Sequence, residues 1–290
     1  MAVLSCADTQ QNLGVSKCIK IPKLIKGIIT TPDDFSIPFT DAVSATAWQT
    51  ALLAAKSNRI YYWPEAKVIE NLNEESIYQE TPVGSLFVRD GRYRWRISFE
   101  GNLQQHKAMF SHKQFRGRIF LIDIDNKIIG TSEDGIAFRG FSIDLINPEK
   151  LAISDGTNAT LTPVYLSLTD NLELDENGSQ VETGGFLRTL TRLSTVNLTL
   201  SNTSSGGFTV TVLNAFDNEP VLGLVLADFT LQDSTGAAVT INAVVDNQDG
   251  TYAATTGVLT AGTYSVNLVA SSALTVQGFE SGAAVTYDVA

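Results

Sequence analysis

Turn residues recur about every 8–13 positions between residues 194 and 290, and short β-rich runs separate them. These runs, such as residues 208–212 and 264–269, are rich in Val together with Thr, Phe and Tyr. No helical periodicity interrupts them. Short strands separated this regularly by turns are typical of a β-sandwich, so we predict one for this region. The turn clusters lie at residues 204–207, 217–220, 233–236, 246–250, 261–262 and 271–272.

A break in charge marks the start of the same region. All 20 Lys and Arg precede Leu193, whereas eight of the 31 Asp and Glu follow it, so residues 193–290 carry −8 of the net charge of −11. Such a break indicates a domain boundary, and 290 residues suffice for two domains. A segment without cations is unsuited to binding a phosphate backbone. We predict an N-terminal arm at 1–18, a β domain at 19–185, a linker at 186–193 and a β-sandwich at 194–290.

The first domain is predicted to be mainly β with one or two helices. Residues 40–56 show the clearest helical pattern, with Thr40 as the N-cap and Trp48 and Leu52 on one face. Strands are expected at 59–63, 66–72, 84–89 and 92–99, and Asp90-Gly91 reads as a hairpin turn between the last two. Residues 170–185, which are acidic and contain glycine, are predicted to form a loop.

Three arginines alternate with apolar residues in the strand predicted at 92–99. Arg92, Arg94 and Arg96 share one face, and Tyr93, Trp95, Ile97 and Phe99 share the other. In one interpretation the apolar face lies on the core, and the arginines lie in water beside carboxylates such as Glu65 or Glu70. In the other, the arginines dock on acidic residues of another subunit, since Arg suits interfaces. Arg92, Arg94 and Arg96 are therefore candidate subunit-interface residues.

The sequence offers little for catalysis, and we predict no enzyme, no cofactor and no metal site. It lacks a phosphate-binding glycine loop and a Gly-x-Ser-x-Gly elbow. His106 and His112 lie six residues apart in a helix predicted at 102–113, so they point in different directions. Cys6 and Cys18 are read either as reduced thiols in the arm or as a pair that forms a disulfide when exposed to oxidant. No run of about 18 apolar residues occurs, so no membrane insertion is expected, and we expect synthesis in a host cytoplasm without a secretory signal.

Three pieces of the C-terminal region resemble bacterial immunoglobulin-like domains. Residues 210–221 resemble the first strand and turn of that family, and residues 246–252 resemble its aspartate-glycine-tyrosine turn. Residues 260–266 resemble its tyrosine corner, in which the hydroxyl of Tyr264 would bond the upstream backbone. The antibody-type cysteines are absent, and Val266 stands two residues after Tyr264. The resemblance implies an Ig-like β-sandwich and says little about function.

The first 190 residues resemble, in layout, the tail tube (major tail) proteins of long-tailed bacteriophages. The layout consists of strands, one helix near residues 41–56, a long hairpin region and an ending at residues 140–151 and 163–170. The resemblance implies a small β-barrel or sandwich that forms six-fold rings, which stack through the hairpin and the arm into a tube, with the Ig-like domain outside. The implied partners are copies of the chain, other phage tail proteins, and DNA that passes without sequence-specific binding. The implied location is the tail of the virion.

Two other functions remain open at this stage. One is a virion decoration or adhesin-like module that recognises a surface partner or a glycan through its Ig-like domain. The other is a carbohydrate-active enzyme with an accessory Ig-like domain. Its candidate carboxylate pairs, such as Glu74-Glu75, are adjacent residues in polar segments, which is typical of solvated surface charge rather than of a glycosidase pair.

Overall fold

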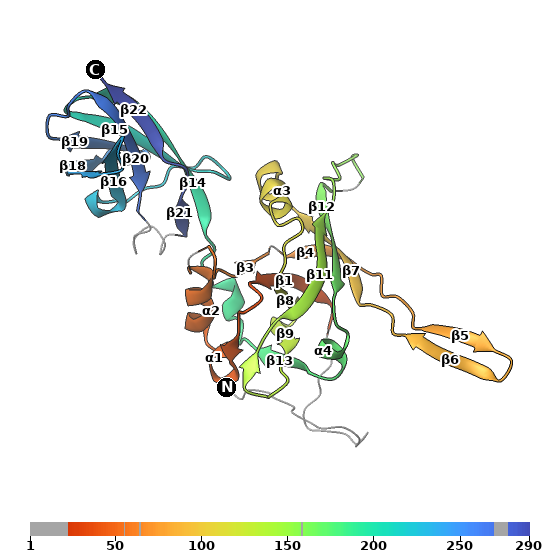
Figure 1. Ribbon diagram of the computed structural model, residues 1–290. Helices are drawn as coiled ribbons and strands as arrows, with labels where there is room; N and C mark the ends of the chain where they lie inside the picture. The colour runs from red at the N-terminus through yellow and green to blue at the C-terminus, as the bar shows by residue number, and fades with distance from the viewer. Residues whose placement is uncertain (1–22, 55, 64, 158, 270–277) are drawn as a thin grey trace. The chain divides into compact units, whose positions relative to one another are not determined.

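The computed structural model describes residues 23–54, 56–63, 65–157, 159–269 and 278–290. The predictions for the arm at 1–18, and for Cys6 and Cys18 within it, lie outside the described residues. The fold is mainly β, with 49% strand and 12% helix, which confirms the predicted class. The chain forms two compact units that divide between Leu190 and Thr191 (Figure 1).

The first unit is built around a nine-stranded antiparallel sheet that curls into a half-barrel. Its strands run in the order β13-β9-β8-β11-β12-β7-β4, while β1 pairs with β8 and with β3. The strands are β1 (Ile25–Thr31), β3 (Tyr61–Tyr62), β4 (Ala66–Asn71), β7 (Arg94–Glu100), β8 (Arg118–Asp123), β9 (Lys127–Thr131), β11 (Phe141–Pro148), β12 (Leu161–Leu168) and β13 (Gly178–Glu182). Two further pairs stand outside this sheet: β2 (Ile37–Pro38) with β10 (Ala137–Phe138), and β5 (Ile77–Thr81) with β6 (Gly84–Arg89).

The centre of this sheet is buried on both faces. Along β8, Ile119 and Leu121 join one apolar cluster, formed with β7, β11 and β12. Phe120 and Ile122 join a second cluster on the opposite face. Because successive side chains of a strand point to opposite faces, an uninterrupted apolar run suits a strand covered on both sides. The curl of the sheet encloses the first cluster, and short helices contribute to the second.

The helix predicted at 40–56 is broken into two, α1 (Phe39–Ala42) and α2 (Ala45–Leu52). Thr40 therefore lies inside a helix and is not its N-cap; the break comes at Ser44, which is extended with φ −98° and ψ 123°. Phe39 and Trp48 are both buried in the second cluster. Nine residues apart on one continuous helix they would point in opposite directions, so the break is what lets both reach the core. Trp48 packs edge-on against Phe120 with ring centroids 5.2 Å apart.

Residues 170–185 are not the predicted loop. They contain α4 (Leu172–Asp175) and β13, which pairs with β9. An ion pair explains why this acidic segment folds onto the sheet: Glu173 contacts the Arg118 guanidinium and also accepts a hydrogen bond from the Ser142 backbone N–H at 2.6 Å. The chain then enters the 3₁₀ helix η1 (Phe186–Arg188), where Leu187 is buried in the second cluster. The first half of the predicted linker at 186–193 thus packs within the first unit.

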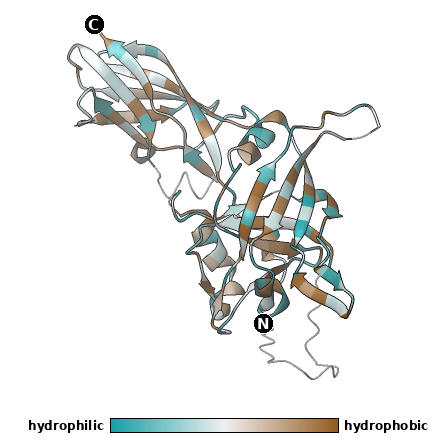
Figure 2. Cartoon of the chain, turned by 45° about the vertical axis from the view of Figure 1, so that its right-hand side comes forward, coloured by the Kyte–Doolittle hydropathy of each residue, from teal (hydrophilic) through white to brown (hydrophobic). Residues whose placement is uncertain are grey.

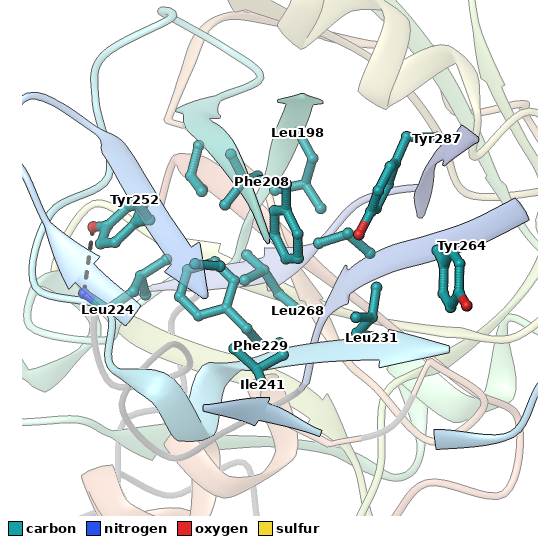
Figure 3. Close-up of a cluster of buried hydrophobic side chains, with 14 of the residues drawn as sticks. Leu198, Phe208, Leu224, Phe229, Leu231, Ile241, Tyr252, Tyr264, Leu268 and Tyr287 are labelled. Carbon is teal, nitrogen blue, oxygen red and sulfur yellow. Dashed lines mark hydrogen bonds between the residues drawn. The ribbon is translucent and has the colours of Figure 1, made fainter. Parts of the chain in front are cut away.

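The second unit is a β-sandwich. A five-stranded sheet in the order β18-β19-β15-β14-β21 and a four-stranded sheet in the order β17-β16-β20-β22 contribute inward-facing side chains to one apolar cluster (Figure 3). The strands are β14 (Ser194–Ser204), β15 (Gly207–Asn214), β16 (Phe229–Asp233), β17 (Ala238–Val239), β18 (Ile241–Asp246), β19 (Thr251–Thr256), β20 (Gly262–Leu268), β21 (Phe279–Ser281) and β22 (Val285–Val289); the 3₁₀ helix η2 (Leu226–Asp228) precedes β16.

Tyrosine hydroxyls tie the loops of this sandwich to its strands. Tyr264 Oη donates to the Thr260 carbonyl at 2.9 Å, the contact that a tyrosine corner requires. Tyr252 is buried, donates to the Val221 carbonyl at 2.6 Å and accepts from the Leu224 N–H at 3.3 Å (Figure 3). Gly250, with φ 83°, makes the preceding turn in a conformation that favours glycine. The two bonds of Tyr252 satisfy backbone groups of Val221 and Leu224, which are buried residues of the loop.

Removing the carboxylate of Glu173 is expected to destabilise the first unit. The Arg118 side chain is 11% exposed, so without Glu173 it would stay buried with only the exposed Asp33, 3.8 Å away, as counter-charge, and Glu173→Ala should lower the free energy of unfolding by about 3 kcal/mol. Denaturant unfolding followed by tryptophan fluorescence measures this unit, because all three Trp residues precede residue 96. The exposed Glu176→Ala is the control and should change stability by less than about 0.5 kcal/mol. Equal effects of the two variants would contradict this interpretation.

Two phenylalanine substitutions test the tyrosine corner in the second unit. Tyr264→Phe removes the bond to Thr260 and should lower the stability of the sandwich by about 1 kcal/mol. Tyr287 is the matched control, since its buried hydroxyl has no hydrogen-bond partner among the described residues. Tyr287→Phe should therefore be neutral or stabilising. Native-state hydrogen exchange of β20 and β22 amides measures both, and a larger loss for Tyr287→Phe would refute the assignment.

Candidate interaction surface

A long β-hairpin leaves the nine-stranded sheet of the first unit. It begins where β4 pairs with β7, and it continues through the hydrogen bonds from the Leu72 N–H to the Arg94 carbonyl and from the Glu74 N–H to the Arg92 carbonyl. The chain then forms the separate pair β5–β6, which projects from the body of the unit (Figure 1). One continuous ribbon, residues 66–100, thus carries β5 and β6 away from the sheet; we call β5, β6 and their turn the distal hairpin.

The hairpin reverses at Pro82-Val83, not at the predicted Asp90-Gly91. Thr81 pairs with Gly84, which leaves a two-residue turn between them. Asp90-Gly91 instead lies where β6 runs into β7, and Gly91 is not among the glycines with positive φ. A Cβ on Gly91 would stand 1.9 Å from the Glu74 carbonyl oxygen, so glycine is needed here because the two arms of the ribbon approach closely.

Apolar side chains cover both faces of the distal hairpin. Tyr78 and Phe87 are directly paired across the strands, with ring centroids 5.8 Å apart, and each is 57% exposed. Leu86 and Val88 lie on the opposite face and are also more than half exposed. Figure 2 shows the resulting hydrophobic bands on the projecting strands. A two-stranded ribbon is at best marginally stable without a covered face, and clustered exposed apolar residues mark interaction sites. The distal hairpin therefore has the properties of a binding element.

Charges hold the base of this ribbon. Glu74 contacts Arg94 through one carboxylate oxygen, and its other oxygen lies 3.3 Å from Arg89 Nη1. Partial burial alone would raise the pKa of Glu74, but the charge of Arg94, the Arg92 N–H and Arg89 together hold that pKa below its ordinary value. The Glu74 carboxylate thus links the outgoing arm of the ribbon to Arg89 and Arg94 on the returning arm. We call Glu74, Arg89 and Arg94 the neck.

Side chains between β12 and the end of α4 contact the ribbon beside the neck. Asn171, between β12 and α4, contacts the Gly91 carbonyl through its side-chain amide. Tyr93 stacks on Trp95 with ring centroids 5.8 Å apart, and its hydroxyl donates to Asp175 of α4. That hydrogen bond, with burial, raises the pKa of Tyr93 to about 12. These contacts fix the direction in which the ribbon leaves the sheet.

The three arginines predicted as interface residues all have carboxylate partners within the chain. Arg92 Nη1 lies 2.8 Å from Asp144 Oδ2, and Arg94 contacts Glu74. Arg96 lies 2.9 Å from Glu149 and 3.6 Å from Glu70. Of the two carboxylates suggested by the sequence, only Glu70 pairs with one of these arginines. Glu65 instead lies 3.4 Å from Lys26. The face is therefore a set of compensated charges, and its role between subunits stays a prediction.

The histidines do not meet. His106 Nδ1 lies 3.1 Å from Thr162 Oγ1, whereas His112 packs between the rings of Tyr61 and Trp63, where burial lowers its pKa. Within the described ranges, no group of three or more His, Cys, Asp or Glu side chains is arranged to hold a metal ion. Among the helices that the structure describes, none is long and apolar enough to span a bilayer.

Comparison with known proteins adds no functional assignment. The sequence matches no protein-family model, and it matches no curated protein.

Sequence reasoning missed the first strand of the distal hairpin. It predicted residues 84–89 as a strand but left Ile77–Thr81 unassigned, because Gln79, Glu80 and Thr81 look polar. The signal that could have found it is Pro82, followed two residues later by Gly84, a combination typical of turns. Glu74 was read as solvated surface charge, although it joins two arginines.

Neutralising Glu74 is expected to loosen the neck. Glu74→Gln removes the charge that faces Arg89 and Arg94, so amide exchange at Leu72 and Glu74 should accelerate by about threefold to tenfold. Glu75→Gln is the matched control, because Glu75 is exposed and should leave those rates unchanged. Since the pKa of Glu74 is lowered by folding, its contribution is present above the ordinary glutamate pKa and is lost as the pH falls through the lowered value. Equal exchange in both variants would show that the neck charge is dispensable.

Proposed function

We propose that the protein is a structural subunit of a bacteriophage tail tube, which assembles with copies of itself into stacked rings around a DNA-conducting channel. The observation that carries this proposal is the distal hairpin, which presents Tyr78, Phe87, Leu86 and Val88 to solvent on a base held by the neck. An element that is apolar, exposed and fixed in direction is suited to inserting into a neighbouring molecule. The six-fold ring is taken from the resemblance of the first 190 residues to tail tube proteins.

Head-to-tail contact between copies explains why the exposed apolar surface lies on a projecting hairpin. A projecting element that binds a different surface of the next copy makes a heterologous contact, and such contacts generate rings or filaments. A self-complementary patch would generate a closed dimer instead. A ribbon that reaches out from a curled sheet is accordingly the geometry that favours an extended assembly.

The charges support passage of DNA without retention. The net charge is −11, and Arg92, Arg94 and Arg96 are neutralised by Glu70, Glu74, Asp144 and Glu149. Binding of a phosphate backbone requires cations that are free to replace counterions, so a compensated face binds it weakly. The Ig-like unit supports a role on the exterior of the tube, because residues 193–290 hold eight acidic and no basic residues. In this proposal the protein turns over no substrate.

Assembly of the purified full-length chain tests the proposal. Wild-type protein at high concentration should form rings or tubes in negative-stain micrographs and sediment as large species. A Tyr78→Ser/Phe87→Ser variant should form no tubes, because its hairpin loses the aromatic pair. Val258→Ser is the control: it also removes an exposed apolar side chain, 90% exposed in the second unit, and should assemble like wild type.

Two results would count against the proposal in different ways. Wild-type protein that stays monomeric at every concentration and salt would contradict self-assembly itself. A Tyr78→Ser/Phe87→Ser variant that assembles as well as wild type would show that the distal hairpin is not the contact.

A further inference from the structure

Helix α3 (Leu103–Phe110) presents a second exposed apolar stripe in the first unit. Leu103 is 69% and Phe110 is 43% exposed. Seven residues apart, they lie on the same side of the helix, and Lys107 lies between them. An exposed Leu and an exposed Phe on one helical face are more than scattered surface residues, so this face is a candidate for contact with another molecule.

The side of α3 next to this stripe is anchored, which fixes the stripe outward. Met109 is buried in the cluster enclosed by the curled sheet. Asn102 caps the helix by accepting from the Gln105 N–H at 2.8 Å, and His106 bonds Thr162 of β12. The helix therefore cannot rotate to bury Leu103 and Phe110 without losing these contacts.

The segment around this stripe is basic. Residues 101–117 contain Lys107, Lys113 and Arg116 and no Asp or Glu. No ion pair joins any of these three cations to another described residue, although Lys113 Nζ lies over the Phe110 ring, 5.2 Å from its centroid. The face thus combines exposed apolar groups with uncompensated positive charge, and its partner should be apolar and acidic.

The distal hairpin has that complementary chemistry. Residues 77–88 contain Glu80 and no Lys or Arg, and Arg89 at the end of β6 is paired with Glu74 of the neck. Glu80 lies near the turn and accepts from Ser85 Oγ at 2.6 Å, on the same face as the paired rings of Tyr78 and Phe87. Figure 1 shows α3 and β5–β6 in separate parts of the first unit, with the hairpin directed away from the helix. The two surfaces therefore meet only between copies.

We propose that the distal hairpin of one copy docks on the α3 face of a second copy, with Tyr78 and Phe87 against Leu103 and Phe110. Glu80 then lies near Lys107 and its basic neighbours. The contact is heterologous, because each copy offers a hairpin and an α3 face at different places. This inference rests on the proposed self-assembly and names the surface that receives the hairpin.

Mixing two defective variants tests the contact directly. The hairpin variant is Tyr78→Ser/Phe87→Ser, and the face variant is Leu103→Ser/Phe110→Ser. Neither variant alone should form tubes, because every hairpin contact needs one intact hairpin and one intact face. A mixture should form complexes that contain both variants, since the face variant supplies the hairpin and the hairpin variant supplies the face.

Failure of this inference is distinguishable from failure of the proposed function. If the face variant forms tubes like wild type while the hairpin variant does not, the hairpin docks elsewhere, and the inference is overturned although self-assembly stands. If wild-type protein never assembles, both are overturned. Tryptophan fluorescence of each variant confirms that its first unit is folded.

A charge exchange provides a second test with exposed residues only. Glu80→Lys and Lys107→Glu should each weaken assembly by about tenfold in concentration, because each places like charges opposite one another. The double variant should recover to within about threefold of wild type. A double variant about 100-fold weaker, the product of the two single effects, would overturn the pairing.

Discussion

Burial of β1 and β8 on both faces is the constraint on which the first unit depends. The alternating side chains of β8 reach two separate apolar clusters, one enclosed by the curl of the sheet and one containing Trp48, Phe39 and Leu187. A sheet fixed at its centre in this way can carry an unsupported extension at its far edge. The ribbon of residues 66–100 is that extension. The direction of its base is set by β7, because Trp95, Ile97 and Phe99 of this strand are buried in the enclosed cluster.

Electrostatic pairing then determines what each surface is able to bind. Near the ribbon, arginines form ion pairs with carboxylates: Glu74 pairs with Arg89 and Arg94, and Glu149 pairs with Arg96. Around α3 the cations have no such partners among the described residues, and Glu80 on the distal hairpin has no Lys or Arg partner there either. Compensated charge rigidifies the support, whereas uncompensated charge of opposite sign marks the two surfaces that we propose to meet.

The sequence predicts the sandwich better than it predicts the ribbon. Regular turns, residues 246–250 and Tyr264 are local signals, and local chemistry decides each of them, so the β-sandwich could be predicted from the chain alone. The break at Ser44 could not be read locally, because it depends on Phe39 and Trp48 sharing one core. The roles of Gly91, Glu74 and Glu173 depend on residues far along the chain or across the sheet, which no spacing rule reveals. The arginine alternation was visible, but its carboxylate partners were only partly foreseen.

Concentration-dependent hydrogen exchange of the distal hairpin tests the central claim most directly. In dilute full-length protein the amides of β5 and β6 should exchange rapidly, because this pair has no covered face. At high concentration they should be protected by about tenfold or more, while the amides of β8 keep the same slow rates throughout. Rapid exchange of β5 and β6 at every concentration would contradict the claim that this hairpin is the element through which copies of the chain assemble.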